Sequence, residues 1–292
     1  MACHNGQASN RRCSSLSRAG SLTLAAVFTA SERSALRDWL VALARADEQV
    51  TAAAVLGSGA DGSEDRWSDI DLAVRLTPGQ DPMVAADSWA ERLGKRVRLV
   101  SQLDMWSSGA LYRVFLLPDT LQVDISFWPD DRFAAYGPKF HLVFGEPNDA
   151  VSLPPVSPGS VLGMAWLYAL HIRSSIARGR TLQALYMING ARDQVVQLAC
   201  LRQGLPSAQG RGADDLSPEL KTALKGTLPQ STGDAELRRC FGEIARLVVD
   251  EACHVDPQGA RGLEDVLAEL VRTAEPAAND SPATRSIPTI AP

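Results

Sequence analysis

The sequence predicts an α/β domain, built on a small mixed sheet with flanking helices, followed by an all-α helical domain. Three observations predict this architecture. Short apolar runs that end at glycine or proline fill the first half of the chain, and such runs are typical of strands. Long stretches with helical periodicity fill the second half. Between residues 145 and 159 the chain is rich in proline, as expected of a linker.

The first domain is expected to cover residues 30–145. Its first helix should begin near Ser31 as N-cap, because Glu32 then falls in the first turn. A glycine-rich loop, either irregular or with one helical turn, is expected at residues 59–68, with solvated charges such as Glu64. The other expected elements are strands at 52–56 and 70–76, a helix at 82–93, a strand at 97–100, and a hairpin of strands at 111–117 and 120–127.

The second half is expected to be helical. Residues 146–158 are the expected linker, and the helical domain should cover residues 159–273. The expected helices lie at 161–178, 182–202, 218–225, 234–253 and 263–272. Residues 1–29 are expected to be a disordered leader, and residues 274–292, rich in Pro, Ala, Ser and Thr, a disordered tail.

Composition restricts the classes of function. Of 292 residues, 45% are hydrophobic and 22% are charged, as in ordinary globular proteins, and the formal net charge is -5. A general nucleic-acid binder would usually be basic. Five scattered cysteines without CxxC spacing predict a cytoplasmic protein. No apolar run is long enough to predict a membrane span. Monomer and homodimer both remain open.

The residues that carry chemistry lie between Val55 and Leu72. A predicted strand ends at Gly57-Ser58, where a glycine-rich turn would let backbone amides and one hydroxyl approach phosphate oxygens. Asp69 and Asp71 begin the next strand, and alternate strand residues point to the same face. Two neighbouring carboxylates repel each other, and a hard divalent cation such as Mg²⁺ relieves that repulsion.

Asp124 is the third candidate carboxylate. It is a lone charge in an apolar β-prone run, Leu121 to Phe127, and an unpaired buried carboxylate is costly. Its position is explained if it faces the same metal ions as Asp69 and Asp71. The three side chains would then hold two ions that bridge a nucleoside triphosphate and the attacking group.

The Gly-Ser, spacer and Asp-x-Asp pattern formed by Gly57, Ser58, Asp69 and Asp71 resembles the signature of the DNA polymerase beta-type nucleotidyltransferase superfamily. Asp124 falls in the later strand where that signature has its third carboxylate. The signature covers about 18 residues. A sheet domain followed by a helical domain also resembles bacterial antibiotic nucleotidyltransferases, including aminoglycoside and lincosamide adenylyltransferases, and hence suggests a role in antibiotic resistance.

The resemblance implies magnesium-dependent transfer of a nucleoside monophosphate, AMP from ATP, to an acceptor hydroxyl, with release of pyrophosphate. Gly57, Ser58 and nearby amides would hold the phosphates, and Asp69 and Asp71 would bind both Mg²⁺ ions. Asp124 would bind the ion nearest the acceptor or deprotonate the acceptor; its position does not separate these roles. Ser68 would donate to a metal-bound carboxylate or simply start the strand.

The predicted helix at 182–202 carries further candidates. Tyr186, Asn189, Arg192 and Asp193 fall roughly on one face. In the enzymes that the sequence resembles, the helical domain contributes polar contacts to the nucleotide. Tyr186 would then stack on the base, and Arg192 would neutralise phosphate charge. The alternative is a polar interface between helices.

The acceptor is the open question. An aminoglycoside would need a cleft lined with acidic groups, whereas a lincosamide would need a more apolar pocket. Trp106, Tyr112, Trp128 and Tyr136 either line an acceptor pocket or belong to the core. Two other functions stay open: a nucleotidyltransferase of toxin–antitoxin type that modifies a tRNA or a protein, and a non-catalytic nucleotide-binding module. Composition shows no basic track for tRNA, and the presence of all three carboxylates disfavours a decayed site.

Overall fold

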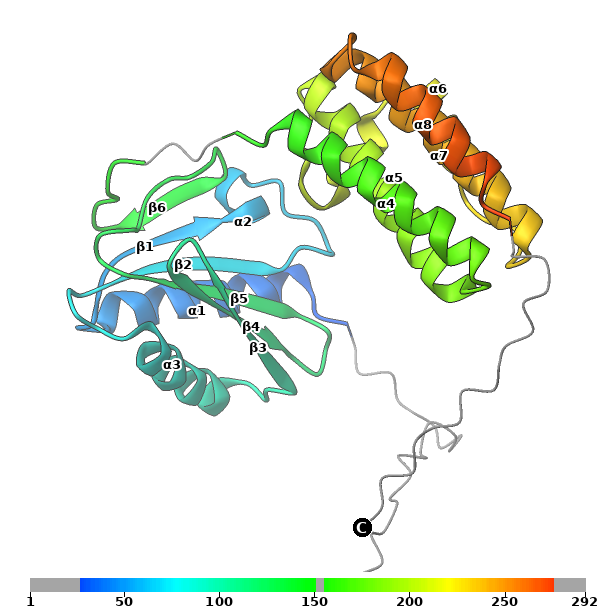
Figure 1. The fold of residues 1–292 in the computed structure, drawn as a ribbon. Coiled ribbons are helices and arrows are strands. Elements are labelled where there is room, and N and C mark those ends of the chain that lie inside the picture. Colours follow the sequence, from blue (N-terminus) through cyan, green and yellow to red (C-terminus); the bar gives the residue numbers. More distant parts are fainter. Residues whose placement is uncertain (1–26, 151–154, 276–292) are drawn as a thin grey trace, which may run out of the picture. The chain divides into compact units, whose positions relative to one another are not determined.

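The computed structural model describes residues 27–150 and 155–275. The chain forms two compact units, Met1–Leu153 and Pro154–Pro292. Most of the expected leader, most of the expected tail and the middle of the expected linker lie outside the described residues. The first unit contains the sheet and the second consists of helices, so the predicted fold class is confirmed (Figure 1).

The first helix, α1 (Ala30–Ala46), begins two residues earlier than expected. Thr29, rather than Ser31, is its N-cap. The Thr29 hydroxyl accepts a hydrogen bond from the Glu32 amide at 3.2 Å, and the Glu32 carboxylate accepts one from the Thr29 amide at 2.8 Å. This reciprocal capping box satisfies two backbone donors that a helix otherwise leaves unpaired.

Six strands form one mixed sheet in the order β3-β4-β5-β2-β1-β6. The central pair, β2 and β5, is parallel, and every other neighbouring pair is antiparallel. The helices α2 (Gly57–Asp61) and α3 (Pro82–Arg96) belong to the same unit. The strands are β1 (Val50–Leu56), β2 (Ile70–Leu76), β3 (Ser101–Ser107), β4 (Ala110–Leu116), β5 (Gln122–Trp128) and β6 (Phe140–Phe144).

The observed sheet differs from the expected one at two strands. The strand expected at 97–100 lies instead at 101–107, where β3 forms an exposed edge whose pattern has no buried face. Its pairing with β4 is the interaction that makes it a strand. The strand β6 was not predicted, because its side chains are only partly buried and it pairs along one side, with β1.

The two faces of the sheet differ. One face packs on α1 and α3 through a large apolar core (Figure 1). The other face has a small cluster that combines alanines with large aromatic residues, namely Ala52, Ala54, Ala73, Ala110, Trp128 and Phe133. Small side chains on the strands leave room above the sheet, and this second face is where the candidate site lies.

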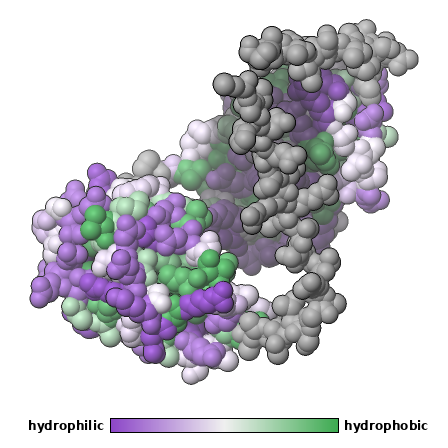
Figure 2. All heavy atoms as spheres, turned by 90° about the horizontal axis from the view of Figure 1, so that it is seen from below, coloured by the Kyte–Doolittle hydropathy of each residue, from purple (hydrophilic) through white to green (hydrophobic). Residues whose placement is uncertain are grey.

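Some apolar side chains of the sheet unit are exposed. Leu103 and Met105 on the edge strand β3 and Leu116 on β4 all contact solvent. Figure 2 shows apolar patches among hydrophilic residues on one surface of the molecule. Scattered exposure of this kind is common in folded proteins and by itself identifies no partner.

The second unit is a helical bundle with its own core. Its longest helices have apolar residues in their interior faces, including Ile188 on α5 and Phe241 on α7. No described helix of the chain combines the length and the apolar character that a membrane span requires. The helices are α4 (Pro158–Ala177), α5 (Thr181–Gln203), α6 (Pro218–Gly226), α7 (Asp234–Val255) and α8 (Ala260–Arg272), with short 3₁₀ turns at Ala208–Gly210 and Ala213–Asp215.

Candidate active site

Gly57 is the residue at which β1 ends and the candidate site begins. Its φ of 59° lies in the left-handed region, where a side chain is disfavoured. A Cβ atom at this position would collide with the carboxylate of Asp71. Gly57 and Ser58 are the first two residues of the short helix α2, which extends into the start of the expected loop. The glycine therefore lets the backbone come close to a carboxylate of the neighbouring strand.

The three predicted carboxylates come from adjacent strands. Asp69 immediately precedes β2, Asp71 is its second residue, and Asp124 lies in β5 directly opposite Asp71. Residues that pair across strands share a face, as do residues two apart along a strand. All three are partly exposed. The fold thus brings Asp69, Asp71 and Asp124 to one end of the open sheet face.

The surroundings of Asp124 disfavour its charged form. Burial, reinforced by the nearby Asp69, raises the pKa of the Asp124 carboxyl to about 6. Asp69 accepts a hydrogen bond from the Gln122 side chain, with 3.3 Å between Nε2 and Oδ2. Gln122 is two residues before Asp124 on the same strand face, a placement that sequence reasoning overlooked.

The carboxylates suit a hard cation whose remaining ligands are water or phosphate oxygens. Among the described residues, no group of three or more His, Cys, Asp or Glu side chains stands ready to enclose a metal ion. Magnesium is usually bound by one or two carboxylates together with waters and substrate phosphates. The pairing of Asp71 with Asp124, and the raised pKa of Asp124, fit such a partial site.

The loop between α2 and β2 is held by ion pairs, so the expectation that Glu64 is a solvated charge was wrong. Its carboxylate contacts Arg33 Nε at 3.3 Å and an Arg37 terminal nitrogen at 2.7 Å, both from α1. Arg33 is only 3% exposed and also donates to the Asp65 carbonyl. The Ser68 hydroxyl accepts from the Asp65 amide at 2.9 Å. This network fixes the chain just before Asp69.

The candidates from the helical domain belong to the second unit. Tyr186 is exposed on α5. Arg192 donates from Nε to the Thr227 hydroxyl at 2.6 Å and from another nitrogen to the Thr227 carbonyl at 2.9 Å. It also contacts Asn189 at 2.6 Å. Arg192 thus joins α5 to the end of α6, which is the contact that a polar helix interface requires. Nucleotide contacts by Tyr186 and Arg192 stay predictions.

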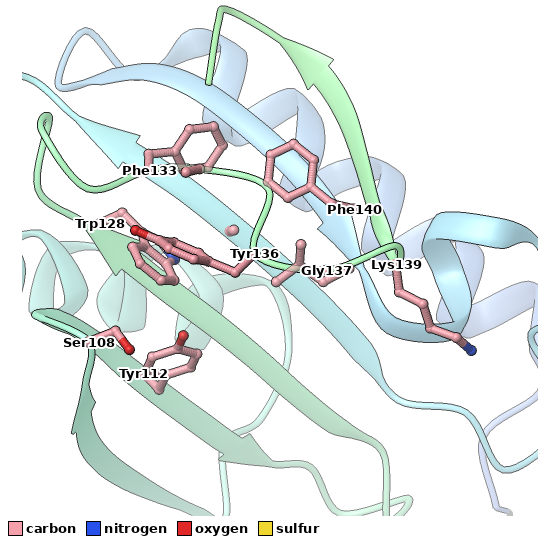
Figure 3. Close-up of a pocket in the computed structure, with 11 residues that line it drawn as sticks. Ser108, Tyr112, Trp128, Phe133, Tyr136, Gly137, Lys139 and Phe140 are labelled. Carbon is pink, nitrogen blue, oxygen red and sulfur yellow. The ribbon is translucent and has the colours of Figure 1, made fainter. Parts of the chain in front are cut away.

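A cavity of about 250 Å³ opens on the same sheet face as the carboxylates (Figure 3). Three of the four aromatic residues considered from sequence line it, namely Tyr112, Trp128 and Tyr136. Trp106 does not: it is 56% exposed on β3. The further lining residues, which sequence reasoning missed, are Leu56, Ala73, Ser108, Phe133, Ala134, Gly137, Lys139 and Phe140.

Neither a protein-family model nor a curated protein matches the chain. Similar solved structures include an aminoglycoside 6-adenyltransferase from Bacillus subtilis, 14% identical, with a TM-score of 0.34 over 80% of this chain and 96% of the other. A nucleotidyltransferase-like protein from Exiguobacterium sibiricum is 15% identical, with a TM-score of 0.36, covering 81% and 80%. The non-canonical poly(A) polymerase complex GLD-2–GLD-3 is 13% identical, with a TM-score of 0.27, covering 85% and 63%.

Proposed function

We propose that the protein is a magnesium-dependent nucleotidyltransferase that moves a nucleoside monophosphate, AMP from ATP, to a hydroxyl group of a small molecule. One observation carries the proposal: Gly57, Asp71 and Asp124, distant in sequence, meet on one face of the sheet. A close backbone approach beside paired carboxylates is an arrangement that suits a triphosphate with bound Mg²⁺.

The residues of the site would have separate roles in binding phosphate and metal. Ser58 and the amides that follow Gly57 would hold the β- and γ-phosphates. Asp69 and Asp71, with Asp124, would hold Mg²⁺, which neutralises phosphate charge when it is bound. The glycine at 57 is required because a side chain there would occupy the space of the Asp71 carboxylate.

The transfer is a substitution at the α-phosphorus. The acceptor oxygen forms a bond to phosphorus while the bond from phosphorus to the β-phosphate oxygen breaks, and pyrophosphate leaves with that electron pair. The acceptor's hydroxyl proton passes to Asp124 or to solvent. Positioning and charge neutralisation supply most of the catalysis in reactions of this kind. The ion pairs of Glu64 with Arg33 and Arg37 position the chain that leads to Asp69.

The test is incubation of the full-length protein with α-labelled ATP, Mg²⁺ and a panel of hydroxylated acceptors that includes aminoglycosides, lincosamides and neutral aryl alcohols. We expect pyrophosphate release that needs both Mg²⁺ and one class of acceptor, with a mass gain of one AMP on that acceptor. The same reactions with GTP, CTP and UTP identify the preferred nucleotide. Absence of transfer with every nucleotide and acceptor would overturn the proposal.

A further inference from the structure

The cavity opens on the face of the sheet that carries the proposed catalytic residues. Leu56, which lines the cavity, directly precedes Gly57, and the lining residue Ala73 lies two residues after Asp71 on β2. Tyr112, also in the lining, has its pKa raised by burial and by the Asp124 carboxylate. The lining residue Trp128 lies four residues after Asp124 on β5, so the cavity is on the sheet face that carries Asp124.

The walls of the cavity are aromatic. The Trp128 and Tyr136 rings are stacked, with centroids 5.3 Å apart and planes inclined by 22° (Figure 3). Tyr112 meets Trp128 edge-on at 6.0 Å, and Phe133 lies 5.6 Å from Phe140. Rings arranged in this way favour another ring that can stack on them or meet them edge-on.

The size of the cavity fits one ring with substituents. Its volume is about 250 Å³. An apolar protein cavity of roughly 150 Å³ is sufficient to bind benzene. The space left over would hold a short side chain that carries a hydroxyl group.

The cavity has no negative charge in its lining. None of its lining residues is Asp or Glu, and Lys139 is its single charged member. The Lys139 amino group points away from the aromatic rings (Figure 3) and pairs with Asp61 at 3.3 Å. A polycation entering this space would lose its hydration without gaining a counter-ion from the lining, which is costly. The lining therefore disfavours an aminoglycoside ring system and suits an uncharged ring.

We propose that this cavity binds an uncharged aromatic ring of the acceptor and directs the acceptor's hydroxyl group toward Asp124. The proposal rests on the nucleotidyltransferase function proposed above and specifies its acceptor as a neutral aryl alcohol. The competing occupant is the base of the nucleotide, and binding of an unreactive ATP analogue distinguishes the two.

Binding of probes to the full-length protein tests the proposal without any turnover. The probes are 4-nitrobenzyl alcohol and chloramphenicol as neutral aryl alcohols, kanamycin as a polycation, and α,β-methylene-ATP as a nucleotide that cannot react. Three variants accompany the wild type: Tyr136→Ala removes a wall ring that is 37% exposed, Tyr136→Phe keeps the ring, and Trp106→Ala removes an aromatic side chain outside the cavity. Calorimetry gives the dissociation constants.

At least one aryl alcohol should bind to the wild type. Tyr136→Ala should raise its dissociation constant by about tenfold, because the ligand loses one aromatic contact. Tyr136→Phe and Trp106→Ala should bind it like the wild type, and kanamycin should not compete. Failure of both aryl alcohols to bind, or equal binding by Tyr136→Ala, overturns the proposal. Weaker binding of the ATP analogue alone in Tyr136→Ala overturns it as well and assigns the cavity to the base.

The transfer assay keeps this inference separate from the proposed function. If the aryl alcohols bind in the cavity but no acceptor receives AMP, the nucleotidyltransferase function fails while the ring-binding chemistry of the cavity stands. If AMP is transferred to kanamycin and no aryl alcohol binds, the function stands and the aromatic acceptor fails.

Discussion

Asp71 on β2 pairs directly with Asp124 on β5. The two strands are parallel and hydrogen-bonded, so the carboxylates leave the same face of the sheet at adjacent positions. Adjacent acidic groups on strands repel each other unless something of opposite charge lies between them. Burial, with a smaller contribution from the nearby Asp69, raises the pKa of Asp124, so the folded chain disfavours its ionised form.

Replacing either acidic residue of the Asp-x-Asp pair should remove transfer and leave the fold intact. Asp69→Asn and Asp71→Asn each keep the size of the side chain and remove its charge. We expect transfer to fall by at least about a hundredfold, because a bound metal contributes several kcal/mol to such reactions. Pyrophosphate release and thermal unfolding measure the two effects. Undiminished transfer in either variant contradicts the metal assignment.

Gly57→Ala should inactivate the protein through a collision that a matched variant lacks. The new Cβ would press on the Asp71 carboxylate, at a backbone φ of 59°. Gly62→Ala introduces the same kind of strain, at a φ of 71°, with nothing near the new atom. Both should lose about 1 kcal/mol or more of unfolding free energy. Transfer should be lost only in Gly57→Ala, and equal transfer in the two variants would count against the role of this close approach.

Asp124→Asn should stabilise the metal-free protein at high pH while abolishing transfer. The pKa of Asp124 is raised to about 6 in the folded chain from an ordinary 3.8. Ionisation of Asp124 therefore costs folding free energy as pH rises from about 4 to about 6, and the cost is complete above that range. Allowing for its partial exposure, Asp124→Asn should be more stable by about 1–2 kcal/mol at pH 8.

Denaturant unfolding of both proteins in chelator measures this difference. The difference in unfolding free energy between the two proteins should fall toward zero at pH 4, where the wild-type Asp124 carboxyl is protonated in the folded state. A variant that is less stable than the wild type at pH 8 would show that Asp124 is stabilised by its surroundings, contrary to its raised pKa.

Glu64→Gln should loosen the chain that leads to Asp69. The substitution removes the charge that faces Arg33, which is 3% exposed, and Arg37. We expect a loss of about 1–3 kcal/mol of unfolding free energy, because the buried Arg33 guanidinium would lose the charged partner that faces it. Glu243→Gln, in an exposed pair with Arg246 on α7, should change it by less than about 0.5 kcal/mol. Equal effects of the two substitutions would refute the positioning role.

Local patterns were sufficient to predict much of this fold. The run from Ile70 to Leu76 and the turn at Pro118 and Asp119 have clear apolar patterns and turn residues, and the structure has a strand and a hairpin there. The edge strands β3 and β6 have no such pattern, because each pairs along one side only and is largely or partly exposed. Their existence depends on partners distant in sequence.

The candidate site was likewise predictable from the local sequence only in part. Asp69 and Asp71 were predictable from their spacing, and Asp124 from a lone charge in an apolar run. The contact of Glu64 with α1 and the meeting of Phe133 with Phe140 in the cavity wall depend on tertiary packing. Neither has a signal in the local sequence, because a loop charge or a single aromatic residue looks the same whether it is exposed or packed.

Metal binding in the presence of nucleotide shows whether the Asp71 side of the sheet is the catalytic site. Mn²⁺, a spectroscopic substitute for Mg²⁺, can be titrated into the wild type and Asp71→Asn in the presence of α,β-methylene-ATP and followed by electron paramagnetic resonance. We expect nucleotide-dependent binding of about two ions per chain in the wild type, because carboxylates and phosphates together supply the ligands. This binding should be lost in Asp71→Asn. Equal Mn²⁺ binding by both proteins would contradict the assignment of this sheet face as the catalytic site.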